Sequence, residues 1–185
     1  MLAKVKSIRF LLLTLLAPSL LFQVQAVAAA DDIDRFVGRY QGRATITEGN
    51  GEIDRDLSVD VSKTKQGFNV KWTSVTRKKD GKLKSKEYTI DFIPTRRANV
   101  YAAAMKTNIF GAREPLDPMR GDPYVWARIT GDTLGLFALL INDDGGYEMQ
   151  AYDRTLAAEG LNLKYSRIRD GRQLRTIEAL LRRQQ

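Results

Sequence analysis

The chain has 185 residues and a formal net charge of +8 at pH 7, with no cysteine and no histidine. These absences exclude a disulfide framework, a lipid-bearing cysteine, thiol catalysis, histidine-based triads and zinc sites of the usual kinds. An excess of positive charge favours anionic surroundings, but it identifies no partner.

The first 30 residues have the pattern of a cleavable secretory signal peptide. Three basic side chains precede an apolar run over 10–22, and alanines at 28–30 offer a cleavage site before Asp31. The run is interrupted at Pro18 and is short for a membrane span, which needs roughly 20 apolar residues; an uncleaved anchor is the alternative. We expect a periplasmic or secreted mature chain, 31–185, that forms one domain without a membrane span.

Short runs of alternating apolar and polar residues, as in half-buried strands, fill most of the mature chain. Leu57, Val59 and Val61 show this alternation, and turn signals such as Asn-Gly and Asp-Gly separate the runs. The expected strands span 39–47, 57–62, 68–73, 87–92, 99–106, 123–130, 133–141, 147–155 and 161–169. Eight or nine strands joined by tight hairpins predict an all-β fold, a single antiparallel up-and-down barrel.

Helical segments are expected at both ends of the mature chain. Residues 31–36 predict one short helical turn, and 172–183 predict a C-terminal α-helix. In that helix Leu174, Ile177 and Leu181 would share one side, with most arginines elsewhere. We expect this basic helix to dock on its own barrel, and nucleic acid is not an expected partner of an exported protein.

Three aromatic residues, Trp72, Tyr88 and Trp126, are predicted to point into the barrel, because each shares the parity of apolar neighbours on its strand. A barrel of about eight strands has room either for a filled core or for one small ligand. The alanines at 102–104 leave volume that something must occupy. Core packing and ligand contact therefore remain alternatives for these rings.

Arg128 shares the face of Trp126, so the same parity would place a cation inside the barrel. A buried charge needs a partner, which would be a ligand carboxylate or a side chain such as Glu148 or Asp153. If the strand end lies in solvent, Arg128 needs none.

The segment 107–121 is the longest stretch without a periodic pattern. Its length makes it a candidate functional loop, in which Phe110 and Arg113 would touch a ligand at the barrel mouth. Pro115 and Pro118 also fit an ordinary stiff connection.

Neither a metal site nor an active site emerges from the acidic residues. The turn at 142–146 has a calcium-like composition, but it lacks the alternating carboxylates and the final glutamate of a calcium loop. Glu48, Glu52, Glu148 and Asp153 are not spaced as a catalytic pair. We expect no metal, no cofactor and no enzymatic activity.

Gly38 and Tyr40 open the first strand, and Arg167 lies on the last expected strand. In this order of elements the chain resembles the calycin group, which includes lipocalins and fatty-acid-binding proteins. Lipocalins carry a Gly-x-Trp step at the first position and an arginine that packs over the aromatic ring. The resemblance implies that Gly38, Tyr40 and Arg167 close the barrel, through a cation–π contact of about 0.5–2 kcal/mol; a ligand-binding pair is the alternative. Nitrobindin-like haem barrels open similarly, but their histidine ligand has no counterpart here.

Two hypotheses for function follow. The first is an exported, non-enzymatic barrel that binds a hydrophobic or amphipathic small molecule in its interior. Its expected ligand-binding residues are Trp72, Tyr88, Trp126, Arg128, Phe110 and Arg113. The second is a filled barrel that acts through its surface loops, as an envelope interaction or inhibitor protein. The oligomeric state is not predicted.

Overall fold

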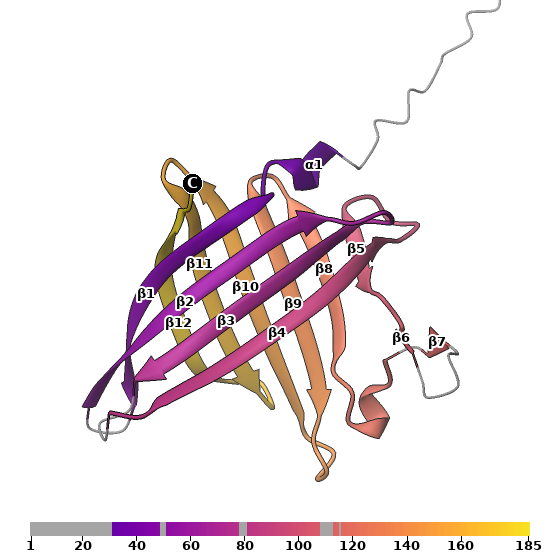
Figure 1. Cartoon of the computed structure of the whole chain (residues 1–185). Coiled ribbons are helices and arrows are strands. Elements are labelled where there is room, and N and C mark those ends of the chain that lie inside the picture. The colour runs from indigo at the N-terminus through magenta and orange to yellow at the C-terminus, as the bar shows by residue number, and fades with distance from the viewer. Residues whose placement is uncertain (1–30, 49–50, 78–80, 108–112, 115) are drawn as a thin grey trace, which may run out of the picture.

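The computed structural model describes residues 31–48, 51–77, 81–107, 113–114 and 116–185, and they form a closed antiparallel β-barrel (Figure 1). The elements are α1 (Asp31–Asp34), β1 (Gly38–Glu48), β2 (Gly51–Lys63), β3 (Phe68–Arg77), β4 (Leu83–Pro94), β5 (Val100–Ala103), β6 (Lys106–Thr107), β7 (Arg113–Glu114), the 3₁₀ turn η1 (Pro118–Arg120), β8 (Tyr124–Thr130), β9 (Thr133–Ile141), β10 (Tyr147–Ala157), β11 (Gly160–Arg169) and β12 (Arg172–Arg183). No helix in these ranges is long and apolar enough to span a bilayer.

The barrel wall contains ten strands that follow one another in chain order. The sequence β1-β2-β3-β4-β5-β8-β9-β10-β11-β12 closes where β12 pairs with β1, and β6 and β7 form a separate two-stranded sheet. In Figure 1, β1–β4 cross the front and β8–β12 form the back. The predicted all-β up-and-down barrel is confirmed, with ten strands instead of eight or nine.

The short helix α1 covers one end of the barrel (Figure 1). Ile33 and Phe36 are buried at this end with Phe68, and the Phe68 ring stacks 5.2 Å from Phe92. Lys63 at the end of β2 forms an ion pair with Asp34. The α1 end therefore holds the packed core and is closed to ligands.

The segment 172–183 is strand β12, so the predicted C-terminal helix is wrong. Asp170 and Gly171 both adopt positive φ, 47° and 76°, which is the geometry of a two-residue hairpin turn rather than a helix start. Ile177 and Leu181 are buried, whereas Leu174 is 51% exposed beside an irregularity in the β11–β12 pairing. Strand pairing on both edges, with β11 and with β1, overrides the helical propensity of this leucine- and arginine-rich segment.

The predicted inward orientation of Trp126 is also wrong, and with it the alternative that places Arg128 inside the barrel. On β8 the buried side chains are Val125, Ala127 and Ile129, so the other parity faces outward. The Trp126 ring stacks on Phe137 at 5.2 Å, and the Arg128 guanidinium lies 5.8 Å from the centre of the same Phe137 ring. The outer face of the neighbouring strand β9 is itself apolar, and the Trp126 ring partly covers it. The outward residues of β8 therefore look as apolar in sequence as the inward ones.

Candidate functional site

The end of the barrel opposite α1 contains a cavity of about 410 Å³. Strands β2, β3 and β4 form one wall, and β10, β11 and β12 form the other. This volume lies within the range of roughly 300–1,000 Å³ that is typical of small-molecule sites. The barrel is therefore filled at one end and hollow at the other.

A row of four aromatic side chains crosses the cavity from wall to wall. Tyr88 stacks on its cross-strand partner Trp72 at 5.1 Å, and Tyr152 lies 4.7 Å from its partner Tyr165. Trp72 and Tyr152 then meet across the lumen at 5.4 Å. Burial raises the pKa of Tyr152 and of Tyr165 above the ordinary value, so both phenols are neutral at physiological pH. The row offers flat apolar faces to a ligand.

An apolar hollow of about 150 Å³ adjoins this row. It shares Trp72, Tyr88, Gln150 and Tyr152 with the larger cavity. Its remaining lining is almost entirely apolar and consists of Ile90, Pro123, Val125, Leu136, Phe137, Ala138 and Leu140. The two spaces together join an apolar recess to a polar one.

The larger cavity is strongly cationic. Its basic lining residues are Arg55, Lys84, Lys86, Arg154, Arg167 and Arg175, and none of its described lining residues is acidic. Arg167 and Arg175 are direct cross-strand partners, an arrangement of like charges that destabilises a sheet unless an anion is near. Lys84 and Lys86 also have a structural explanation. β4 pairs with β5 only over Phe92–Pro94, so the part of β4 that carries Lys84 and Lys86 has one edge without a β5 partner. Inward lysines discourage the pairing of another chain with such a strand edge.

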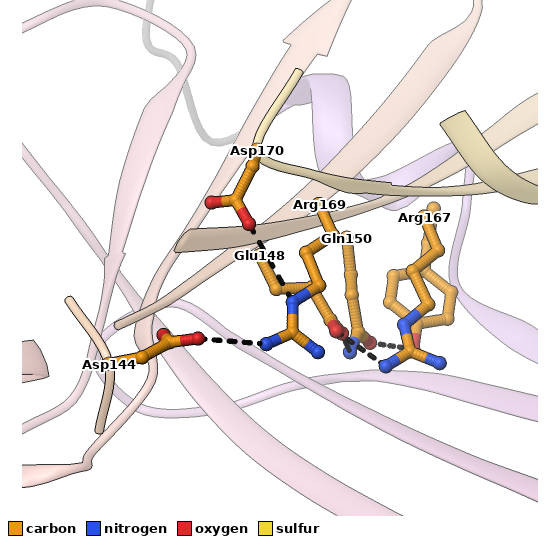
Figure 2. A network of polar contacts seen from close by, with 7 residues as sticks. Asp144, Glu148, Gln150, Arg167, Arg169 and Asp170 are labelled. Carbon is orange, nitrogen blue, oxygen red and sulfur yellow. Dashed lines mark hydrogen bonds and ion pairs between the residues drawn. The ribbon is translucent and has the colours of Figure 1, made fainter. Parts of the chain in front are cut away.

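One carboxylate neutralises part of this charge next to the cavity. Glu148 is buried and forms a 2.5 Å ion pair with Arg167 Nη2, while Gln150 Nε2 donates to its other oxygen at 2.7 Å. The hydrogen bond from Arg167 holds the pKa of Glu148 below its ordinary value, against the opposing effect of burial. Figure 2 shows Glu148, Gln150 and Arg167 converging, with Arg169 between Asp144 and Asp170 nearer the turn. Of the alternatives for Arg128, pairing with Glu148 is therefore wrong, and the structure agrees with an Arg128 that lies in solvent.

Arg154 lies deeper in the cavity and is 1% exposed. Its guanidinium carbon lies 5.7 Å from the centre of the Trp72 ring and 5.5 Å from that of Tyr152. Arg154 Nη1 donates a long hydrogen bond of 3.5 Å to the Tyr152 carbonyl, and Nε has no hydrogen-bond partner among the described residues. Burial lowers the pKa of Arg154 to about 10.

Two of the predicted ligand-binding residues line the cavity, and two others lie elsewhere. Trp72 and Tyr88 are lining residues, whereas Trp126 and Arg128 lie on the outer face of β8. Phe110 lies outside the described residues, and Arg113 belongs to the short strand β7. The predicted contact of both with a ligand stays a prediction.

Sequence reasoning missed the β10 side of the site. Along β10 the residues of inward parity are Glu148, Gln150, Tyr152 and Arg154. A run of polar side chains at alternate positions, within a strand whose other face is also partly polar, is the signal that was available. A strand that is polar on its inner face points to a wet interior.

Arg183 closes the barrel over Tyr40, so the predicted role of Arg167 is wrong. The Arg183 guanidinium lies 4.8 Å from the centre of the Tyr40 ring, and its nitrogens donate to the Tyr40 hydroxyl at 2.6 Å and the Val37 carbonyl at 2.8 Å. Gly38 lies directly beneath, because a Cβ there would come 2.4 Å from Arg183 Nη1. The expected arginine on the last strand exists, but the last strand is β12 and not β11.

Among the described residues, no group of three or more acidic side chains could hold a metal ion. The calcium-like turn uses Asp144 otherwise: its carboxylate accepts from the Gly146 amide at 3.0 Å and from Arg169 at 3.4 Å. This is a hairpin turn held by its own side chain.

No protein-family model matches the chain, and no curated protein matches it. Among solved structures, the S-type phycobiliprotein lyase CPES from Guillardia theta is similar with a TM-score of 0.33 and 7% identity, over 83% of this chain and 90% of the lyase. That protein is named a lyase, which contradicts the prediction that this barrel is not an enzyme, and we do not keep that prediction. At this TM-score the match assigns no activity to the chain. The part of the sequence-based expectation that holds is the barrel itself, an antiparallel wall of strands in chain order.

Proposed function

We propose that the protein binds an amphipathic small molecule inside its barrel. The observation that carries this proposal is the cavity of about 410 Å³ whose walls combine an aromatic row with basic side chains. The basic side chains belong to neither core cluster, whereas Trp72 and Tyr152 of the aromatic row also pack against the main core.

The chemistry of the lining supports an amphipathic rather than a purely apolar ligand. The hollow of about 150 Å³ beside Trp72 and Tyr88 is apolar, so the hydrocarbon part of a ligand that enters it leaves water. The larger cavity presents guanidinium and ammonium groups, which a wholly apolar molecule would leave without a partner. A molecule with one apolar and one polar part satisfies both spaces.

The alternative, a filled barrel that acts through surface loops, requires a packed interior. The cavity weighs against that interior at the end of the barrel opposite α1. Export to the periplasm or the exterior is part of the proposal and is supported by the signal-like pattern of 1–30. Mass spectrometry of the protein from its native envelope fraction should then find a chain that begins at Asp31.

Native mass spectrometry tests the proposal directly. Protein from the native host is measured before and after denaturation, and a discrete extra mass that leaves on unfolding is the expected result. In parallel, the neutral fluorophore N-phenyl-1-naphthylamine is titrated into the purified protein. Trp72→Ala should weaken its binding, because Trp72 borders both spaces.

Trp126→Ala is the matched control, since it removes the same side chain from the outer face of β8. Equal loss of binding in both variants, or none in either, would contradict an interior site. A bare polypeptide mass together with no probe binding would return the barrel to the surface-acting alternative.

A further inference from the structure

The buried arginine Arg154 lacks the partner that its position requires. A guanidinium removed from water must be compensated by an anion and by hydrogen bonds to its nitrogens. The ion pairs of the described residues do not include Arg154, and Nε has no hydrogen-bond acceptor. Asp153, its neighbour in sequence, occupies the opposite parity of β10 and faces the other side of the strand.

The contacts that Arg154 does make are too weak to explain its burial. It has one long hydrogen bond to a backbone carbonyl and two ring faces at 5.5–5.7 Å. Burial correspondingly lowers its pKa to about 10. Arg167, in contrast, has a buried carboxylate at 2.5 Å. The same interior therefore supplies a counter-ion to one arginine and none to the deeper one.

The position of Arg154 makes it reachable by a ligand. It lines the larger cavity together with Val59, Leu163 and Leu181, at the boundary with the packed core. An anion that enters from the open end passes Lys84, Lys86 and Arg175 before it reaches Arg154. These more exposed cations raise the local concentration of anions but keep their own contact with water.

We propose that Arg154 is the anion-binding residue of the cavity, and that the ligand carries a carboxylate, phosphate or sulfonate group beside an apolar or aromatic body. This inference rests on the proposed function and names the chemical class of its ligand. The anionic group lies against the Arg154 guanidinium, and the body lies along Trp72 and Tyr152 towards the apolar hollow. The ligand thus supplies the negative charge that pairs with the Arg154 guanidinium.

Two fluorophores that differ by one anionic group test this inference. 1-Anilinonaphthalene-8-sulfonate and N-phenyl-1-naphthylamine share one ring system, and only the first carries a sulfonate. Wild-type protein should bind the sulfonate about tenfold or more tighter than the neutral probe, as a charge-assisted hydrogen bond to a buried guanidinium implies. Arg154→Met should bring the two affinities close together and leave neutral-probe binding nearly unchanged.

Arg128→Met is the control, because it removes the same group from the outer surface and should keep the wild-type preference. Arg154→Lys keeps a cation and should keep part of the preference. Equal affinities of the wild type for the two probes, or a preference for the sulfonate that survives Arg154→Met, would overturn the inference. Binding of the neutral probe would still leave the proposed function standing. Binding of neither probe would overturn both.

If Arg154→Met does not fold, the wild-type protein carries the test. The ¹⁵N-labelled Nε–Hε resonance of Arg154 should shift when the sulfonate probe is added and stay in place with the neutral probe. A resonance that moves equally with both probes, or with neither, would overturn the inference.

Discussion

Replacing Arg154 by methionine should stabilise the empty protein, although it removes a fully buried side chain. Methionine keeps the apolar stem in the cavity wall and removes a charge that has no carboxylate partner among the described residues. Exchange of a buried charge for an apolar group of similar size is often neutral or stabilising. A residue that lowers the stability of its own fold is one that is kept for binding.

The magnitude follows from the pKa of Arg154. Burial lowers it to about 10, well below the ordinary value for an arginine, and one pKa unit corresponds to about 1.36 kcal/mol. The folded-state pKa is the lower one, so at pH 7 both states are protonated and the whole penalty of about 3 kcal/mol is present. It disappears only as the pH rises through about 10 towards the ordinary pKa of an arginine. Loss of the contacts with two rings returns about 0.5–2 kcal/mol, which leaves a net gain of about 1–2.5 kcal/mol.

This gain is measured by urea unfolding at pH 7, with circular dichroism as the signal. The protein is first refolded free of ligand. A gain of 1 kcal/mol should raise Tm by about 2–4 °C in a domain of this size. Arg128→Met should stay within about 0.5 kcal/mol of wild type, as surface substitutions do. A loss of 2 kcal/mol or more for Arg154→Met would refute the reasoning, because it would show that Arg154 has a structural partner in the empty barrel.

Four further predictions concern the rim of the cavity and the closure of the barrel. Glu148→Gln should increase the affinity for the sulfonate probe several-fold, because it frees Arg167 from its counter-ion; unchanged affinity would count against the cationic site. The same variant should be less stable than wild type at neutral pH, and the difference in unfolding free energy should vanish as acid protonates the wild-type carboxylate, since the folded-state pKa is the lowered one and the stabilisation is lost below about pH 4. Arg183→Met should accelerate amide hydrogen exchange along the β1–β12 ladder and Arg167→Met should not; the reverse order would restore Arg167 as the closing residue. Gly42→Ala should destabilise the barrel by about 1–3 kcal/mol, because its Cβ would lie 2.3 Å from a main-chain oxygen of β12. Gln41→Ala is the control and should leave Tm unchanged, because the Gln41 side chain is exposed; equal Tm values for the two variants would contradict this close packing.

The alternating pattern was sufficient to predict the barrel and half of the aromatic row. Leu57, Val59 and Val61 face inward, as do Trp72 and Tyr88, because on these strands only one parity is apolar. Local patterning of this kind needs no knowledge of neighbouring strands.

The pattern failed where both parities of a strand look alike. On β8 the outward Trp126 is as apolar as the inward Val125, and the choice of face depends on the register with β9. On β12 the leucine and arginine residues fit a helix as well as a strand. This segment forms a strand because it pairs with β1 on one side and with β11 on the other.

The sequence alone therefore determined an all-β chain with antiparallel hairpins, an aromatic face and no cysteine or histidine chemistry. Only the tertiary structure decided where the barrel closes, which arginine packs on Tyr40, and that basic residues from five strands share one cavity with Arg154 at its base. Alternation is a property of neighbouring residues, which a sequence displays directly. Ring closure brings together residues more than a hundred positions apart, so the cationic cavity exists only after the last strand has joined the first.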